Sequence, residues 1–362
     1  EAAKAASETA NFYAEPKSDS LIKSLEDNFA KDINLGGLDL LQNTQEQGLR
    51  ESDRTSRNLL TINEGERNAA IGGFARDLGF VCGNGMDSII EHCLTLFTKP
   101  GDSIINLTPT FIYYDFAAHR QGLEIIEVKR ALKEVSDNSL SYEVNIDEVI
   151  NSIQANTKII FLCSPNNPDG SVVSLEDIKR LAQVCQEKGI VLFIDHAYID
   201  FTDRTKYDAR TIVKDFPSMI VGYTFSKAYG LAGFRVGYAL MHTEMQEKFL
   251  TLLTPFLIAK PSIAAAQAAL EDEGHLRKIL DNNFSQKLWL ELELKALGFK
   301  VFNSEANFLL VKPENTNIFE ELLQKGIIIR EMKALDALRI TVGKPDENQR
   351  LISAIKEIKD CA

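Results

Sequence analysis

The stretch KIIFLCSPNNPDGSVVSLEDIKRLAQVCQEKGIVLFID, residues 158–195, contains two apolar runs joined by an amphipathic segment. The first six and the last six residues are nearly all apolar, which predicts strands that are covered on both faces. Between them, Ser174 and Asp177 form a capping box, and Gly189 marks the end of the predicted helix. The stretch therefore predicts two parallel strands connected by a helix.

Four further short apolar runs repeat this strand pattern along the chain. Several strand–helix–strand units in succession predict an α/β fold with a mostly parallel sheet and helices on both faces. The four runs are residues 103–107, 124–128, 218–223 and 234–240.

The pattern changes from about Ile263. A long helix through Leu297 is followed by a predicted strand over 301–313, a helix, two strands and a last helix from about Glu347. This order predicts a smaller α+β C-terminal domain. We therefore predict three parts: an N-terminal helical arm over 1–55 that packs on the small domain or the substrate mouth, a large domain over 56–262 and a small domain over 263–362.

The bulk composition limits the classes of partner. The chain has 362 residues, of which 44% are hydrophobic and 25% charged, and a net charge of -12. This acidic balance argues against nucleic acid or an anionic membrane as a partner, because such binders usually need a basic face. There is no apolar run of membrane-spanning length and no signal-peptide pattern. Five scattered cysteines without ligand spacing indicate a reducing cytoplasm and no metal site.

The segment YTFSKAYGLAGFRVGY (223–238) places Lys227 in an apolar, glycine-rich run. A lysine is most often a solvated surface residue. Here Thr224, Ser226 and Arg235 are phosphate-binding residue types, and the glycines allow a ligand to approach the backbone closely. A partly desolvated amine beside a phosphate anchor suggests a Schiff base with a phosphorylated aldehyde.

Three other clusters accompany this lysine. SPNNPDG (164–170) reads as an ordinary turn when it is taken alone. Asp195, at the carboxyl end of a predicted strand, can cap a turn or keep a heterocyclic nitrogen protonated. CGNGMDSII (82–90) is a glycine turn into a helix that starts near Asp87, and its free N–H groups can take a phosphate. The four clusters in this order favour a single cofactor site.

These segments resemble those of fold-type I pyridoxal-phosphate enzymes of the class I and II aminotransferase family, and are most similar to its histidinol-phosphate aminotransferase members. The resemblance extends from about residue 80 to the C-terminus. It implies pyridoxal 5'-phosphate as cofactor, an amino acid or amine as substrate, and a homodimer. The stretches that carry it are SPNNPDG, IDHAYIDF, TFSKAYGLAGFRVGY, SEANFLLV, GIIIRE and LRITVG.

The resemblance implies a role for each matching cofactor residue. Lys227 would form the Schiff base and then carry a proton between the substrate α-carbon and the cofactor. Asp195 would pair with the pyridine nitrogen, while Asn167 and Tyr198 would bond the ring 3-oxygen. Phe111 would stack on the ring, unless it is simply a core aromatic residue. The phosphate would be held by Thr224, Ser226, Arg235 and the backbone amides of Met86 and Asp87.

The resemblance also implies substrate contacts. Arg339 in LRITVG would bind the substrate α-carboxylate through two parallel hydrogen bonds, which lysine cannot reproduce. Arg330 in GIIIRE would meet a distal phosphate, although an arginine after an edge strand is usually solvated. Asn307 in SEANFLLV and His196 are further substrate-binding candidates.

Two departures from the family pattern affect the expected substrate and reaction. The family's Asn-Glu-Asn-Pro-Tyr and Arg-Tyr-Pro segments are missing, and acidic stretches stand in that region. The family normally reads Asp-Glu-Ala-Tyr where this chain has His196. Beside Asp195, a histidine can relay protons, act electrostatically near the cofactor oxygen, or pack inertly.

Transamination is the leading prediction, and two alternatives stay open. In one, the enzyme directs arginine or another cationic amino acid to oxygen-dependent oxidation, desaturation or cyclisation in a natural-product pathway. In the other, the chain is a cofactor-binding regulator without catalysis, which the presence of Lys227, Asp195 and Arg339 opposes. The guanidinium site of the first alternative would use Asp39, Glu46, Glu51 and Asp53, although such charges are most often solvated.

Overall fold

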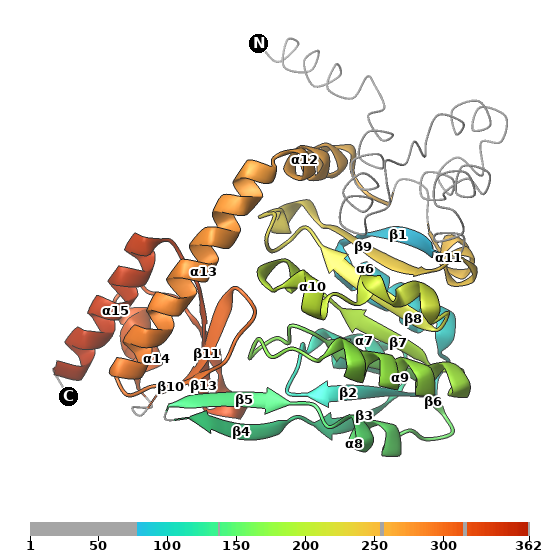
Figure 1. Cartoon of the computed structure of the whole chain (residues 1–362), viewed down its shortest axis with the longest axis horizontal. Helices are drawn as coiled ribbons and strands as arrows, with labels where there is room; N and C mark the ends of the chain where they lie inside the picture. The colour runs from blue at the N-terminus through green and yellow to red at the C-terminus, as the bar shows by residue number, and fades with distance from the viewer. Residues whose placement is uncertain (1–77, 137, 254–256, 314–316, 361–362) are drawn as a thin grey trace, which may run out of the picture. The chain divides into compact units, whose positions relative to one another are not determined.

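The computed structural model describes residues 78–362, except 137, 254–256, 314–316 and 361–362 (Figure 1). The predicted arm over 1–55 lies outside the described residues. The chain divides into two compact units. The first unit contains residues up to Leu96 together with Arg210–His275, and the second contains Phe97–Ala209 and Leu276–Ala362. The predicted domain boundaries after residues 55 and 262 stay predictions.

The second unit contains four parallel strands in the order β7-β6-β2-β3. Their bounds are β2 Ser103–Thr108, β3 Glu124–Lys129, β6 Thr157–Cys163 and β7 Val191–Asp195. Strands β2, β6 and β7 are almost entirely buried, as their apolar runs predicted. Helices α7 (Tyr113–Arg120), α8 (Ile146–Asn151) and α9 (Leu175–Lys188) follow β2, β5 and β6 in the chain.

The capping of α9 explains why this segment forms a helix. The Ser174 hydroxyl accepts a hydrogen bond from the Asp177 backbone amide at 3.1 Å. At the other end, Gly189 adopts a left-handed conformation with a φ of 66°, which glycine adopts without steric cost. The predicted strand–helix–strand unit is confirmed, and with it the parallel α/β class.

The second unit also contains a mixed sheet in the order β12-β13-β11-β10-β5-β4. Helices α13 (Glu273–Ala296), α14 (Ile318–Gln324) and α15 (Pro345–Asp360) pack against it around a core that includes Leu294, Val301 and Ile355. Figure 1 shows these three helices beside the strands. The strands are β4 Ala131–Ser136, β5 Ser139–Glu143, β10 Lys300–Phe302, β11 Phe308–Lys312, β12 Arg330–Met332 and β13 Ala337–Thr341.

The first unit contains an antiparallel set of strands in the order β1-β9-β8. Gly237 on β9 lies so close to the start of α6 that an added Cβ would come within 2.7 Å of the Met86 backbone nitrogen. The elements are β1 Leu78–Asn84, α6 Gly85–Phe97, β8 Met219–Thr224, β9 Val236–His242, α11 Thr243–Leu250 and α12 Lys260–Glu271. Short helical turns complete the described chain: η1 Ile199–Phe201, α10 Arg204–Tyr207, η2 Ala209–Thr211, η3 Val213–Asp215, η4 Ala232–Phe234 and η5 Lys333–Leu335.

Three details differ from the sequence predictions. The predicted strand over 301–313 is two strands, β10 and β11, separated by a loop. The predicted long helix is two helices, because Asp272 leaves the helical conformation and its carboxylate accepts a hydrogen bond from the His275 amide at 2.9 Å. The β4–β5 pair was not predicted, since β4 is exposed throughout and has no apolar face that the sequence would reveal.

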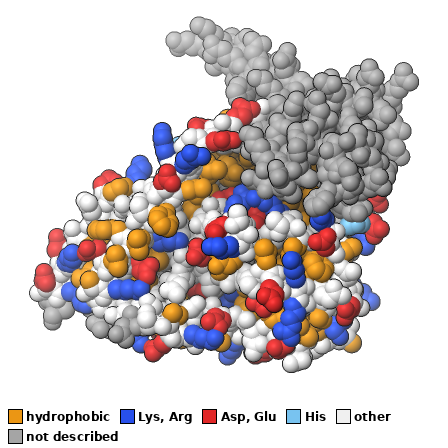
Figure 2. Space-filling model, viewed as in Figure 1, with side chains coloured by type: hydrophobic (Ala, Val, Ile, Leu, Met, Phe, Trp, Pro, Cys, Tyr) orange, Lys and Arg blue, Asp and Glu red, His pale blue; other side chains and the backbone are white. Residues whose placement is uncertain are grey.

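The surface is mixed in charge. On the face shown in Figure 2, Lys and Arg side chains are interspersed with Asp and Glu side chains over the described residues. No helix in the described part of the chain is long and apolar enough to cross a membrane.

Candidate active site

Asp195 is the last residue of β7 and is only 3% exposed. Its Oδ2 accepts a hydrogen bond from the Tyr114 hydroxyl at 2.6 Å, and its Oδ1 accepts one from the Ala197 backbone amide at 2.9 Å. Burial raises the pKa of Tyr114 well above its usual range, and the Asp195 carboxylate adds to this rise. Tyr114 therefore remains a hydrogen-bond donor at neutral pH, and the carboxylate is held in one orientation.

Tyr114 also contacts Phe111, the predicted stacking residue. The two ring centroids are 5.6 Å apart and the rings are nearly perpendicular. On its other side, Tyr114 stacks on Phe161 of β6 with centroids 4.7 Å apart. One buried tyrosine thus fixes both the predicted acid and the predicted stacking ring. Sequence reasoning missed Tyr114, although it follows Phe111 by three residues, about one helical turn.

Asn167 and Arg339 lie together, although they are 172 residues apart in sequence. The Arg339 Nη1 donates a hydrogen bond to the Asn167 Oδ1. The guanidinium carbon lies 5.2 Å from the centroid of the Phe308 ring, in cation–π geometry. The buried Arg339 Nε has no hydrogen-bond partner among the described residues. Because a buried donor is costly without a partner, this N–H marks a place for an anionic ligand.

Tyr198 packs on the same aromatic residue. Its ring meets Phe308 edge-on, with centroids 5.1 Å apart, and Ala306 completes the cluster. Burial raises the pKa of Tyr198, an effect that the positive charge of Arg339 partly opposes. Its hydroxyl therefore keeps its proton at neutral pH and can donate a hydrogen bond.

The loop between β10 and β11 carries Asn307 and is fixed at several points. Lys287 Nζ donates hydrogen bonds to the Ser304 carbonyl oxygen at 2.6 Å and to the Ala306 carbonyl oxygen at 3.2 Å. The Glu305 amide donates to the Gly170 carbonyl oxygen at 2.9 Å, which joins this loop to the SPNNPDG turn. Burial lowers the pKa of Lys287, and the neighbouring Glu305 partly opposes this.

Arg330 lies directly opposite Arg339 in the antiparallel pair of β12 and β13. Directly opposed residues place their side chains on the same face of a sheet. Arg330 is exposed and Arg339 is partly buried. The two guanidinium groups thus belong to one face of the second unit.

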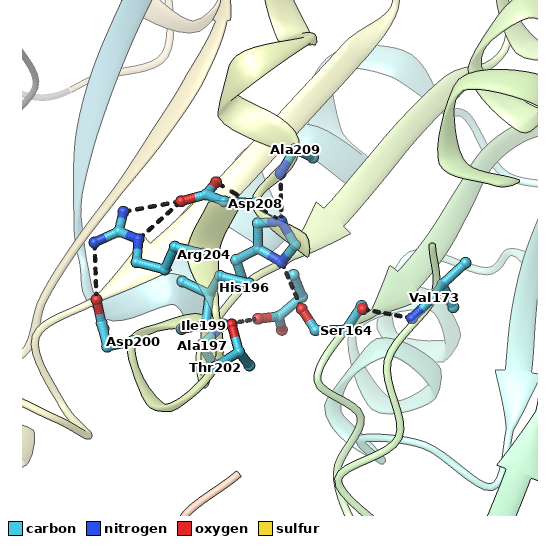
Figure 3. Close-up of polar contacts among 11 residues, drawn as sticks. Ser164, Val173, His196, Ala197, Ile199, Asp200, Thr202, Arg204, Asp208 and Ala209 are labelled. Atoms are coloured by element: carbon cyan, nitrogen blue, oxygen red, sulfur yellow. Dashed lines mark hydrogen bonds and ion pairs between the residues drawn. The ribbon is translucent and has the colours of Figure 1, made fainter. Parts of the chain in front are cut away.

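His196 bridges backbone groups from two segments, as Figure 3 shows. Its Nδ1 lies in hydrogen-bond contact with the Ser164 carbonyl oxygen, and its Nε2 accepts a hydrogen bond from the Ala209 amide at 3.0 Å. A carbonyl can only accept and an amide can only donate, so the ring is neutral with its proton on Nδ1. Asp208 Oδ1 lies 4.0 Å from Nε2, and Asp208 Oδ2 accepts a hydrogen bond from Arg204 Nε at 2.9 Å.

In the first unit, β8 leads into the predicted lysine segment. The Thr224 hydroxyl accepts a hydrogen bond from the Ser226 amide at 3.1 Å and donates one to the Val236 carbonyl oxygen at 3.4 Å. Lys227 is partly buried, and its carbonyl oxygen accepts a hydrogen bond from the Gly230 amide at 3.0 Å. This tight turn places the lysine directly after the end of the strand.

The turn into α6 brings Asp87 and Arg235 together. Arg235 Nη2 lies 2.7 Å from Asp87 Oδ2, and both side chains are 40% exposed. Gly85, with a φ of 77°, precedes the buried Met86. The positive φ of Gly85 favours glycine there, and the Arg235 guanidinium passes close to it, since an added Cβ would lie 2.3 Å from Arg235 Nη2. Backbone amides at a helix start and a nearby arginine form an arrangement that suits a phosphate.

Each unit therefore brings its own predicted residues together. The first unit contains Met86, Asp87, Thr224, Ser226, Lys227 and Arg235. The second unit contains Phe111, Asn167, Asp195, His196, Tyr198, Asn307, Arg330 and Arg339.

Comparison with known proteins defines the class. The model of the family described as aminotransferase class I and II matches residues 42–355. The chain belongs to this family. It is 36% identical to the histidinol-phosphate aminotransferase of Methanococcoides burtonii over 284 residues, which cover 76% of this chain and 74% of the relative. The corresponding enzyme of Methanocella arvoryzae is 34% identical over 287 residues, covering 77% of this chain and 75% of that enzyme.

Solved structures agree on the fold. The histidinol-phosphate aminotransferase from Clostridium acetobutylicum superimposes with a TM-score of 0.71 at 23% identity, covering 94% of this chain and 96% of that one. The enzyme from Sinorhizobium meliloti, solved in complex with pyridoxal-5'-phosphate, gives 0.70 at 22% identity and covers 88% of each chain. The predicted fold class and the resemblance to class I and II aminotransferases are confirmed.

Proposed function

We propose that the protein is a pyridoxal-phosphate-dependent aminotransferase of the histidinol-phosphate type. The observation that carries this proposal is the arrangement of Asp195. A buried carboxylate at the end of a parallel strand, with each oxygen bonded to a fixed donor, suits a partner that must stay protonated. The chain's membership of the aminotransferase family supports it.

The described residues fit the cofactor by the chemistry of their groups. In the second unit, Asp195 offers a carboxylate for the ring nitrogen, Asn167 and Tyr198 offer donors for the ring 3-oxygen, and Phe111 offers a flat ring face. The first unit offers an amine and a phosphate cradle. The cradle residues are Thr224, Ser226, Arg235 and the backbone amides of Met86 and Asp87, and the amine is Lys227.

The roles of the residues follow from the reaction. When bound, pyridoxal phosphate supplies a heterocycle that takes up the electron pair released at the substrate α-carbon. Asp195 keeps a proton on the ring nitrogen, which a carboxylate in a fixed, buried position does well. Lys227 Nζ holds the cofactor and moves a proton at the substrate α-carbon. Tyr198 orients the ring through its oxygen.

Two arginines support a substrate with an anionic group. Arg339 has a buried Nε–H that lacks a partner among the described residues, and Arg330 lies opposite it on β12. Paired guanidinium groups on one face suit a carboxylate or a phosphate, both of which accept parallel hydrogen bonds. We propose that Arg339 binds the group at the substrate α-carbon and that Arg330 and Asn307 contact the more distant part.

We further propose a homodimer that works in the cytoplasm, with the domain division at residues 55 and 262. The dimer is supported by the family resemblance and by exposed apolar side chains on and beside α7, where Ile112 is 77% and Phe116 55% exposed. Sedimentation at micromolar concentration tests it, and a monomer would contradict it.

Absorbance spectra distinguish transamination from the alternative reaction, the oxygen-dependent oxidation, desaturation or cyclisation of arginine. The acidic residues predicted for that alternative lie outside the described residues. The protein is loaded with pyridoxal phosphate and given histidinol phosphate or arginine, with and without oxygen and with no oxo acid present. We expect histidinol phosphate to remove the visible cofactor band regardless of oxygen. A long-lived band with arginine that decays only when oxygen is admitted would contradict the proposal and favour the oxidase.

A further inference from the structure

His196 lies where the ends of β6 and β7 separate. The two strands pair up to Cys163 and Asp195, and one more backbone bond follows, from the Ser164 amide to the Asp195 carbonyl oxygen at 3.0 Å. The His196 side chain then contacts the Ser164 carbonyl oxygen. The His196 side chain therefore adds one hydrogen-bond contact beyond the end of the β6–β7 ladder. This contact joins the two segments that leave the strands and carry candidate site residues.

Ser164 is held at all three of its polar groups. Its amide and carbonyl bond to Asp195 and His196, and its hydroxyl oxygen accepts a hydrogen bond from the Val173 amide at 3.0 Å. Asn167, which would bond the ring 3-oxygen of the cofactor, follows Ser164 by three residues. The His196 ring is thus one of the contacts that hold this turn beside Asp195.

The other ring nitrogen fixes the state of the imidazole. Nε2 accepts the Ala209 amide, so the proton must stay on Nδ1, where it reaches Ser164. The fully buried Asp208 carboxylate faces this edge of the ring and is itself bonded to Arg204, as Figure 3 shows. Arg204 Nη1 in turn donates to Asp200 Oδ1 at 3.2 Å. An ionised glutamate at position 196 would have no proton for Ser164 and would face Asp208 with a like charge.

We propose that His196 is a positioning residue: a neutral imidazole that sets the spacing between the Asn167 turn and the Asp195–Tyr198 segment, and so the shape of the cofactor site. This inference rests on the proposed function. It replaces the expectation that His196 contacts the substrate, because the ring is 1% exposed and both of its nitrogens bond to backbone groups. Because both ring nitrogens bond to backbone groups, the inference also replaces the expectation that His196 relays protons.

Two amide substitutions separate the two bonds of the ring. In His196→Asn, the side-chain amide occupies the place of Nδ1 and keeps the bond to Ser164, but the Ala209 amide loses its acceptor. In His196→Gln, the amide oxygen reaches the place of Nε2 and keeps the bond to Ala209, but the Ser164 carbonyl loses its donor. Each variant loses one buried hydrogen bond, so their melting temperatures should fall by similar amounts.

The test is the dissociation constant of pyridoxal phosphate, measured by equilibrium dialysis on the full chain. We expect His196→Asn to bind within about threefold of the unmodified protein and His196→Gln to bind about tenfold more weakly, on the scale of one hydrogen bond to a rigid framework. The pH midpoint of the visible cofactor band should shift in His196→Gln only. Equal affinities in the two variants, or affinities that simply follow the melting temperatures, would overturn the inference.

Two further results complete the test. If the unmodified protein does not bind pyridoxal phosphate, the proposed function fails, and this outcome is distinct from equal binding by the two variants. If either variant does not fold, nitrogen NMR of the unmodified protein at pH 7.5 decides, since it reports which ring nitrogen carries the proton. A proton on Nδ1 alone supports the positioning role of His196, whereas a proton on Nε2 or on both nitrogens would overturn it.

Discussion

The two units hold their own predicted cofactor residues by different means. In the first unit, the proposed phosphate cradle combines the side chains of Thr224, Ser226 and Arg235 with backbone at the start of α6, which Gly237 approaches closely. The ion pair between Arg235 and Asp87 is 40% exposed on both sides. In the second unit, the acid side consists of buried side chains, with Asp195 at 3% and Tyr114 at 0% exposure.

Substitutions in the two units should therefore have different costs in stability. An exposed ion pair contributes little to stability because water and salt screen it. A buried polar group that loses its partner costs more, because neither protein nor water replaces the bond. We therefore expect side-chain changes to lower the free energy of unfolding little in the cradle and much around Asp195. In the cradle, we expect a loss of stability where an added methyl group meets backbone.

The largest effect is expected at Lys227, the exception in the first unit because the proposed function gives its amine a part in the chemistry. Lys227→Ala removes both the nucleophile and the proton carrier, so turnover should fall by at least about 10⁴-fold. The visible band of the cofactor should also be absent. Steady-state kinetics and an absorbance spectrum check this, and a retained band would refute the assigned role.

The next effect is expected at Asp195. Asp195→Ala should lower kcat by about 10²- to 10³-fold, the scale of a preorganised charge partner, while pyridoxal phosphate still binds. Single-turnover kinetics with saturating cofactor measure this. Unchanged turnover would mean that the buried carboxylate has no part in stabilising charge on the ring.

Gly237→Ala tests the backbone nature of the cradle. The new Cβ would stand 2.7 Å from the Met86 nitrogen, so the turn must shift, and we expect the free energy of unfolding to fall by about 1–3 kcal/mol. Gly233→Ala is the matched control, since nothing lies within 4 Å of its Cβ position. Urea unfolding of both variants checks this, and equal losses would show that crowding at β9 is unimportant.

Tyr114→Phe tests the buried side chains around Asp195, because it removes a single hydroxyl. It keeps the ring packing on Phe161 but removes the donor to Asp195, and we expect a loss of about 1.5–3 kcal/mol in stability, the range for hydrogen bonds to charged groups. Tyr142→Phe is the matched control, because it also removes one hydroxyl from a buried tyrosine that stacks on a phenylalanine, Phe302, but that tyrosine lies in a separate core cluster. If both variants unfold at the same urea concentration, the Tyr114 bond does not hold the carboxylate.

The smallest effect is expected at the exposed pair. Asp87→Asn should change the free energy of unfolding by less than about 1 kcal/mol, because the pair is screened by solvent. The same urea titration measures it at low and high salt. A loss as large as that of Tyr114→Phe would remove the distinction between the two units.

The sequence predicted the regular parts of the fold because their signals are local. The α9 capping box and the apolar runs of β2, β6 and β7 identify these elements within one or two residues. The loop that divides 301–313 was not predictable, since Ser304 and Glu305 leave the strand for bonds to Lys287 and Gly170 that only the folded chain supplies. Tertiary contacts outweigh local preference at such positions.

The candidate site shows the same limit. Residue types and motif order identified Lys227 and Asp195 as candidates, the family resemblance added Arg339, and the roles of all three stay predictions. The residues that hold these candidates in place were not predicted. Tyr114 cannot be distinguished from other core aromatic residues in the sequence, and the two backbone partners of His196 are 32 and 13 residues away from it. The pairing of β6 with β7 brings Ser164 beside His196, and the fold of the following segment brings Ala209 to the other ring nitrogen.

The central claim is that Lys227 is the lysine that holds pyridoxal phosphate. The most direct measurement is to incubate the full chain with the cofactor, reduce it with borohydride, digest it and locate the label by mass spectrometry. We expect one labelled position, Lys227, and a label that disappears in Lys227→Ala. A label at another lysine, or one spread over many surface lysines, would contradict it.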